Sequence, residues 1–249
     1  MQHPVLAANW KMNHGPTEAR EFMRRYLTLS PRRNDRTVMF FPSDLAFSAA
    51  AEACRERSDL LMGVQNIHWE DKGAFTGESS AAMARDAGAR VVLVGHSERR
   101  HVFGETDAMQ AKKCAAAVRA GLTPVLCVGE LLPQREAGQA ESVVLEQLAL
   151  GLAELGVASV ASMLIAYEPV WAIGTGKTAT AADASAMHAV IRGHLRGLLG
   201  EKALAVPILY GGSVNKGNAG SLLGADHVDG LLVGGASLDA EGWSSIVAT

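Results

Sequence analysis

The sequence predicts an α/β protein in which eight parallel strands alternate with helices and close into a single (β/α)8 barrel. Short apolar or β-branched runs alternate with longer helical patterns along the whole chain. Most of these runs are continuously apolar, as parallel strands buried on both faces are. Polar or glycine-rich groups follow nearly every run, as expected where groups converge on a barrel mouth from all round the ring. An open, doubly wound sheet is the alternative, because periodicity does not show closure.

The expected strands and helices follow one another in regular alternation. Eight segments fit strands: Val5–Asn9, Thr37–Phe41, Leu61–Gln65, Val91–Gly95, Thr123–Val128, Met163–Tyr167, Ala205–Tyr210 and Gly230–Val233. Helical candidates between them are Thr17–Leu29, Asp44–Arg57, Asp107–Ala120, Glu141–Leu155 and Ala182–Leu199. Ser43 or Asp44 is expected to cap the second of these helices, and Thr106 or Asp107 the helix that starts at 107.

Composition limits the classes of function. The chain has 249 residues and no linker-like or low-complexity tract, so we expect one domain, residues 1–249. A net charge of −3 gives no electrostatic footprint for nucleic acid or an anionic membrane. Three widely spaced cysteines indicate reduced thiols, with neither a disulfide framework nor a zinc site. No leader pattern opens the sequence and no apolar run reaches membrane-spanning length, so we expect a cytoplasmic protein.

Glu168 is the leading candidate for a catalytic base. It follows the sixth expected strand directly, and Pro169 ends that strand because proline has no N–H to donate to a sheet. The loop that follows, residues 169–179, carries a bulky Trp171 and two glycines, Gly174 and Gly176. A carboxylate beside such a loop suggests a base under a lid that excludes water, where desolvation makes the carboxylate more basic. As one of 26 acidic residues, Glu168 taken alone would be read as a solvated surface charge.

Two further strand ends carry candidate catalytic groups. His96 ends the fourth strand, and a short helix starting at Ser97 would point N–H groups at the imidazole and favour its neutral form. Such a histidine could hydrogen-bond a substrate oxygen without binding metal. Lys11 follows the first strand and could supply positive charge to a phosphate or a developing enolate, with Asn9 as a second donor.

Paired glycines after the last two strands predict a phosphate site. The segments are Tyr210-Gly-Gly-Ser-Val214 and Val233-Gly-Gly-Ala236. One such pair would be a weak signal, because glycine pairs are often plain turns. Two pairs after strands seven and eight match the position at which barrels form a backbone-amide phosphate site.

The chain closely resembles triosephosphate isomerases along its whole length. The matching segments are Asn9-Trp-Lys-Met-Asn13, Gly73-Ala-Phe-Thr-Gly-Glu78, Gly95-His-Ser-Glu-Arg-Arg100, Cys127-Val-Gly-Glu130, Tyr167-Glu-Pro-Val-Trp-Ala-Ile-Gly-Thr-Gly-Lys177, Tyr210-Gly-Gly-Ser-Val214 and Leu232-Val-Gly-Gly-Ala-Ser237. The resemblance implies interconversion of dihydroxyacetone phosphate and glyceraldehyde 3-phosphate through an enediol(ate), without cofactor or metal.

The resemblance also assigns roles to individual residues. Glu168 would shuttle the proton, His96 would polarise the carbonyl, and Lys11 and Asn9 would stabilise negative charge. The phosphate would be bound by Gly174, Ser213, Gly234 and Gly235, and Ser97 and Glu98 would support the site. The closing loop would include Pro169, Trp171 and Gly176. In its closed state Glu130 would contact Trp171, and Tyr210 would hydrogen-bond the loop near Ala179. A homodimer is implied in which Thr76, at the tip of the loop after strand three, steadies Asn9 and Lys11 of the neighbouring subunit.

Two other functions remain compatible with these residues. An isomerase of a four-carbon sugar phosphate could keep the same base, histidine and phosphate site. A non-catalytic phosphate-binding barrel is the alternative from another class, since fold does not fix function. The intact set Asn9, Lys11, His96 and Glu168 disfavours it.

Overall fold

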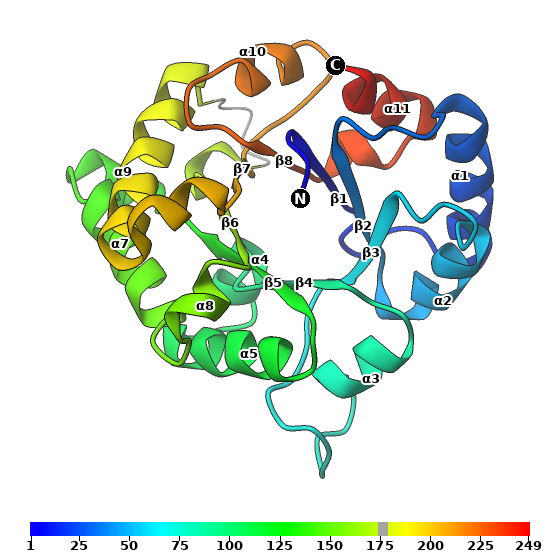
Figure 1. Cartoon of the computed structure of the whole chain (residues 1–249), viewed down its shortest axis with the longest axis horizontal. Coiled ribbons are helices and arrows are strands. Elements are labelled where there is room, and N and C mark those ends of the chain that lie inside the picture. The colour runs from blue at the N-terminus through cyan, green and yellow to red at the C-terminus, as the bar shows by residue number, and fades with distance from the viewer. Residues whose placement is uncertain (174–178) are drawn as a thin grey trace.

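A computed structural model of the chain describes residues 1–173 and 179–249, and the strands of these residues close into a barrel (Figure 1). Every strand is parallel to its neighbours, the order follows the chain from β1 to β8, and β8 pairs with β1. The predicted closed barrel is therefore confirmed over the open sheet. The helices form an outer ring, which is the usual way in which both faces of a parallel sheet are covered.

The strands agree with the sequence prediction except at some boundaries. They are β1 Val5–Asn9, β2 Thr37–Phe41, β3 Leu60–Val64, β4 Val91–Val94, β5 Thr123–Val128, β6 Leu164–Tyr167, β7 Ile208–Tyr210 and β8 Gly230–Val233. The prediction for β7 began three residues too early. Ala205 ends a 3-10 helix, η2 (Gly200–Ala205), and Pro207 lacks the N–H that an interior strand residue donates.

The helices occupy the predicted segments and several additional ones. They are α1 Pro16–Leu29, α2 Asp44–Ala53, α3 Ala81–Asp86, α4 Ser97–His101, α5 Asp107–Arg119, α6 Leu132–Glu136, α7 Ala140–Gly151, α8 Val157–Val160, α9 Ala181–Leu199, α10 Ala219–Leu223 and α11 Ala240–Ala248, with 3-10 helices η1 Val170–Ala172 and η3 Gly235–Ser237. The Thr106 hydroxyl caps α5 by accepting the Met109 N–H, whereas Ser43 precedes α2 without a side-chain cap bond.

Two predicted helices end earlier than their apolar patterns suggested. Residue 57 lies beyond α2, which ends at Ala53, and the Arg57 guanidinium donates to Asp59 at 2.7 and 2.8 Å. Beyond α7, Leu152 is buried although it lies past the last helical residue. Apolar residues that pack from a turn continue a helical pattern past the end of the helix, so the pattern overstates its length.

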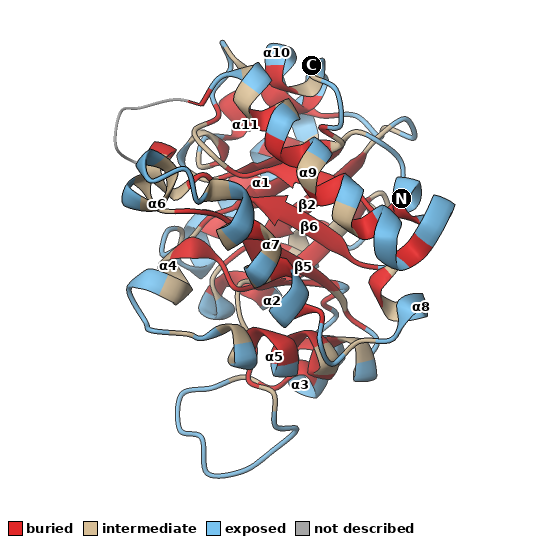
Figure 2. Ribbon diagram, turned by 90° about the vertical axis from the view of Figure 1, so that its left-hand side faces the viewer, coloured by how far each residue is buried: buried red, intermediate tan, exposed pale blue. Residues whose placement is uncertain are grey.

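The strands alternate their side chains between two apolar layers. One layer fills the barrel interior, and the other lies between the strands and the helices. The strands at the centre of the molecule are coloured as buried in Figure 2. On β6, Leu164 and Ala166 point into the barrel, while Ile165 and Tyr167 face the helices. Because side chains repeat every second residue along a strand, the next inward position after Ala166 is Glu168, at the mouth of the barrel.

A long segment between β3 and α3 projects from the barrel (Figures 1 and 2). Residues 71–78 of this segment are exposed, and they include Phe75 and Thr76. Among residues 1–173 and 179–249, no helix combines the length and the apolar character needed to cross a bilayer.

Candidate active site

The mouth of the barrel brings the four predicted catalytic residues around one cavity of about 300 Å³. Asn9 ends β1, where Val5 and Ala7 are the preceding inward residues, just as Glu168 continues the inward series of β6. Lys11 and His96 lie on the loops that follow β1 and β4. Strand register therefore places these side chains together although they are far apart in sequence.

Glu168 is buried, with 2 % of its surface exposed, and is held by the start of α4. Its Oε2 accepts the Ser97 backbone N–H at 2.9 Å, and Oε1 lies 3.4 Å from the Ser97 hydroxyl. The same Oε1 lies 3.0 Å from His96 Nε2. The carboxylate and the imidazole are therefore in direct contact, and Ser97 fixes the carboxylate on the side of α4.

The pKa of the Glu168 carboxyl lies below its ordinary value. Burial raises this pKa, but the hydrogen bonds from His96 and the Ser97 N–H, together with the charge of the Lys11 ammonium, lower it. Desolvation therefore acts on this carboxylate in the expected direction, but the polar contacts of the conformation observed outweigh it. A base bonded to Ser97 and His96 becomes more basic only when it leaves these donors.

The contacts of His96 define a neutral tautomer. Its Nδ1 accepts the backbone N–H of Glu98 at 3.3 Å, at the start of α4. An acceptor nitrogen carries no proton, so in the neutral ring the proton is on Nε2, which then donates to Glu168. The short helix expected at Ser97 is present as α4, and its Glu98 N–H is the donor that His96 Nδ1 accepts.

Lys11 adopts a backbone conformation that few side-chain-bearing residues take. Its φ is +52°, and its N–H donates to Asn9 Oδ1 at 3.0 Å. Gln65 Nε2 donates to the Lys11 carbonyl at 2.8 Å and to the Phe41 carbonyl at 2.9 Å. The ammonium pairs with Glu98 Oε1 at 2.6 Å. Hydrogen bonds to the Asn9 and Gln65 side chains thus hold the Lys11 backbone in its left-handed conformation. The side chain of Lys11 then places a positive charge in the cavity.

Paired glycines line the same cavity. The lining there consists of Gly211, Gly212, Ser213, Val214, Gly234, Gly235 and Ala236. A Cβ at Gly234 would lie 3.2 Å from Lys11 Cε, so the glycine lets the lysine stem approach closely. The predicted phosphate residues Ser213, Gly234 and Gly235 therefore line the same cavity as the lysine, with Gly234 beside it. Gly174 and Gly176 lie outside the described residues.

Glu130 joins the loop after β6 to the barrel. Its side chain is fully buried, and Oε1 accepts Trp171 Nε1 at 2.7 Å and the Tyr167 hydroxyl at 3.1 Å. Its backbone carbonyl accepts the Val170 N–H at 3.1 Å, just beyond Pro169. The Tyr210 hydroxyl has no hydrogen-bond partner within residues 1–173 and 179–249. The contact of Glu130 with Trp171 that the resemblance implies is present. The implied hydrogen bond of Tyr210 to the loop near Ala179 is not formed with any described residue.

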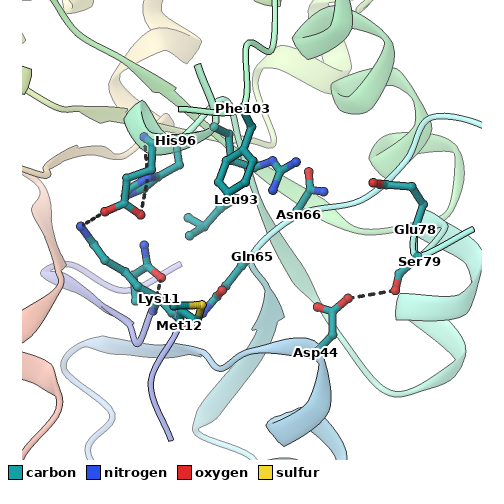
Figure 3. Close-up of a pocket in the computed structure, with 14 residues that line it drawn as sticks. Lys11, Met12, Asp44, Gln65, Asn66, Glu78, Ser79, Leu93, His96 and Phe103 are labelled. Carbon is teal, nitrogen blue, oxygen red and sulfur yellow. Dashed lines mark hydrogen bonds and ion pairs between the residues drawn. The ribbon is translucent and has the colours of Figure 1, made fainter. Parts of the chain in front are cut away.

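A second cavity of about 330 Å³ shares Asn9, Lys11 and His96 with the first (Figure 3). It extends toward Asp44 and the base of the projecting segment, where the Ser79 hydroxyl donates to Asp44 Oδ2 at 2.9 Å. Further lining residues are Met12 and Phe103, both largely exposed. Thr76 itself lies on the exposed tip and lines neither cavity.

Sequence reasoning missed three polar residues that support this mouth. Gln65 was predicted only as the last residue of a strand. As a polar residue at the end of a strand, it could have been recognised as part of the barrel mouth. Gln147 on α7 binds both backbone groups of Gly129, accepting its N–H at 2.7 Å and donating to its carbonyl at 3.2 Å. Arg135 on α6 stacks on Trp171. Neither of these helix residues carries a sequence signal, because each meets its partner only through tertiary packing.

The fold and the mouth together define a class: a barrel enzyme that pairs a buried carboxylate with an imidazole beside a glycine-lined cavity. The chain belongs to the triosephosphate isomerase family, since the model of the family described as triosephosphate isomerase matches residues 4–249. It is 48% identical over 249 residues to a triosephosphate isomerase of Moorella thermoacetica, covering 99% of this chain and 98% of that one. It is 46% identical over 248 residues to that of Solibacter usitatus, covering 99% of both.

A solved structure of a triosephosphate isomerase also superimposes on this chain. The crystal structure of triosephosphate isomerase from Bartonella henselae superimposes with a TM-score of 0.89 at 37% identity, covering 98% of each chain.

Proposed function

We propose that this protein interconverts dihydroxyacetone phosphate and glyceraldehyde 3-phosphate. Family membership over residues 4–249 supports this function. The structural observation that carries it is the contact between Glu168 and His96 Nε2 at 3.0 Å, beside a cavity lined by glycine pairs. Proton transfer between adjacent carbons needs a base for carbon and a donor for oxygen within reach of one small substrate.

In the proposed reaction, Glu168 removes a proton from the hydroxymethyl carbon of dihydroxyacetone phosphate. Negative charge then develops on the carbonyl oxygen, where the Nε2–H of His96 donates and the Lys11 ammonium and Asn9 amide stabilise the enediolate. Return of the proton from Glu168 to the neighbouring carbon, with proton transfer between the oxygens through His96, yields the aldehyde. A neutral imidazole suits this role because it can donate from Nε2 while Glu168 stays ionised.

Before this step, the Glu168 carboxylate has to exchange the Ser97 N–H for the substrate. That bond is 2.9 Å long and lowers the pKa of the carboxyl. Release from Ser97 into a cavity emptied of water would raise the basicity of the carboxylate. We propose that closure of the loop at 169–179 supplies that exclusion and protects the enediolate from losing phosphate, with Pro169, Trp171 and Gly176 in the loop.

The phosphate of the substrate would lie between Lys11 and the glycine pairs. Backbone N–H groups of Ser213, Gly234 and Gly235, together with that of Gly174, are proposed as its donors. The overall charge of −3 does not attract an anion, so binding would depend on these local groups.

We also propose that the protein is a homodimer. The exposed segment 71–78, with Phe75 beside Thr76, would enter the second cavity of the other subunit, next to Asn9 and Lys11. Exposed Met12 and Phe103 at that cavity support the proposal, since large apolar groups are seldom left uncovered together. We propose further that residues 1–249 form one domain and that the protein is cytoplasmic; its cysteines are free and buried, as in a reducing compartment.

A coupled assay with glyceraldehyde 3-phosphate tests the isomerase function. We expect fast turnover without added metal or nucleotide, and kcat should fall far more than KM in Glu168→Asp, which shortens the base. Equal activity of wild type and variant would remove Glu168 from the role of base. Turnover of a four-carbon sugar phosphate alone, or phosphate binding without turnover, would replace the proposed substrate or the enzymatic function.

Deletion of residues 73–78 tests the dimer. We expect a poorly active monomer in sedimentation, because Asn9 and Lys11 lose the support of the neighbouring Thr76. A fully active, unchanged dimer would contradict the proposed interface. Thr76→Ala is the smaller change, and it should weaken the dimer less than the deletion does.

A further inference from the structure

Arg135, on the short helix α6, contacts groups on both sides of the loop after β6. Its Nη1 lies 3.4 Å from Glu130 Oε1, and its Nη2 donates to Asp183 Oδ1 at 2.6 Å. Its guanidinium carbon lies 4.5 Å from the centre of the Trp171 ring. One side chain therefore binds a carboxylate on the barrel, a carboxylate on α9 and an aromatic ring of the loop.

These three partners determine where the two ends of the loop lie. At the first end, Trp171 donates to Glu130 Oε1 at 2.7 Å while its ring stacks against Arg135. At the second end, Asp183 Oδ2 accepts the Thr180 N–H at 2.9 Å and the Thr180 hydroxyl at 2.7 Å. These bonds cap α9 at the residue where the chain leaves the loop. Trp171 and Asp183, twelve residues apart in sequence, thus contact the same guanidinium.

We propose that Arg135 is a positioning residue that holds the two ends of the loop in one relative arrangement, acting through Trp171 and Asp183. The inference rests on the proposed function, because its consequence is the protection of an enediolate by that loop. Among residues 1–173 and 179–249, Arg135 contacts none that lines the cavity around Glu168, so its role is not catalytic.

The chemistry of the site calls for arginine at this position. A guanidinium is planar, so it can stack on an indole face while its edge donates to two carboxylates. A lysine ammonium is a point charge and cannot do all three. Without a cation here, the fully buried Glu130 would keep only the neutral donors Tyr167 and Trp171 within the described chain, and a buried unpaired carboxylate is unfavourable.

The test compares Arg135→Met and Arg135→Lys with wild type, and Arg55→Lys serves as the matched control. Arg55 is an exposed arginine whose ion pair, with Glu56 at 3.5 Å, lies on the surface. The readout is the amount of inorganic phosphate released per triose phosphate isomerised, together with kcat and KM. A merely structural role would lower stability without changing the share of enediolate that loses phosphate.

We expect Arg135→Met to raise that share at least about fivefold and to lower kcat at least about tenfold, with a smaller change in KM. Arg135→Lys should fall between Met and wild type, and Arg55→Lys should match wild type. A share within about twofold of wild type in both Arg135 variants would overturn the inference, whatever kcat does. If Arg135→Met does not fold, the share of enediolate that loses phosphate in Arg135→Lys tests the inference.

Tryptophan emission during titration with 2-phosphoglycolate provides a readout that does not need turnover. Arg135→Lys should alter the change that ligand binding causes, because the stacked guanidinium beside Trp171 is lost. An unaltered change would count against the inference even if the wild type is active. A wild type that binds the analogue without isomerising would remove the proposed function, and the emission result would then decide on Arg135 alone.

Discussion

Substituting Gly129 by alanine is expected to damage catalysis while leaving the phosphate site intact. Gly129 follows β5 and lies beside Glu168, whose N–H donates to the preceding residue, Val128, at 2.8 Å. A Cβ built on Gly129 would lie 1.7 Å from the Glu168 carbonyl oxygen and 2.6 Å from its carbonyl carbon. Both of these are backbone atoms, so no side-chain rotation relieves the overlap.

The size of the effect follows from the displacement that the overlap forces. Real Cβ contacts essentially never fall below 3.0 Å, so a contact of 1.7 Å requires the two backbones to separate by about 1.3 Å. A displacement of about 1 Å in a catalytic group can lower the rate about 100-fold. Gln147 holds Gly129 by two hydrogen bonds from α7, so the shift falls largely on Glu168. We therefore expect kcat to fall about 100-fold or more.

Steady-state kinetics and binding of 2-phosphoglycolate measure the two consequences separately. The proposed phosphate residues follow β7 and β8, away from the overlap, so affinity for the phosphate group should fall much less than kcat. The control is Gly193→Ala on α9, where an added Cβ meets nothing within 4 Å. This variant should keep wild-type kcat and gain about 0.5–1 kcal/mol of stability. A Gly129→Ala enzyme with wild-type kcat would refute the reasoning.

Three further changes have expected outcomes of their own. Burial lowers the pKa of His188 from 6.5 to about 4, so between these values the unfolded chain binds more protons than the folded one. The contribution of His188 to the free energy of unfolding is therefore fully present above pH 6.5 and falls by about 2 kcal/mol between pH 7 and pH 5. Urea unfolding of His188→Gln should show a smaller loss of stability over this pH range than wild type. His96→Gln removes the Nε2 donor and should lower kcat about 100- to 1,000-fold in steady-state assays. Thr106→Ala removes the α5 cap and should cost about 1 kcal/mol in urea unfolding, with kcat unchanged.

Each of these outcomes can be contradicted. A loss of stability at low pH that is the same in His188→Gln and wild type would place the titrating group elsewhere. Near-normal kcat in His96→Gln would show that another group donates to the developing oxyanion. A Thr106→Ala protein as stable as wild type would mean that solvent replaces the hydroxyl at no cost.

The sequence was sufficient for the strand order and for most of the mouth of the barrel. Continuous apolar runs such as Leu164–Tyr167 identified strands buried on both faces, and the polar residue after each run identified the catalytic end. These patterns are local, because the period of two that points Ala166 inward also points Glu168 inward. Boundaries were less certain: Ala205, assigned to the seventh strand because it is apolar, is an exposed residue of a 3-10 helix.

Interactions between distant segments depended on the tertiary structure. The direction of the Glu168 pKa shift depends on the Ser97 N–H and on His96, more than 70 residues earlier in the chain, and it is opposite to the shift that burial alone predicts. The bonds of Arg135 to Asp183 and of Gln147 to Gly129 likewise join segments that only barrel closure brings together.

The sequence by itself determined the α/β class, the alternation of strands and helices along the chain and the chemistry available at the mouth, because each is set by local periodicity and by residue type. Only the tertiary structure decided that the barrel closes and which donors each carboxylate meets. Those choices depend on distances between segments far apart in the chain, and a hydrogen bond or a charge acts over a few ångströms of space whatever the separation in sequence.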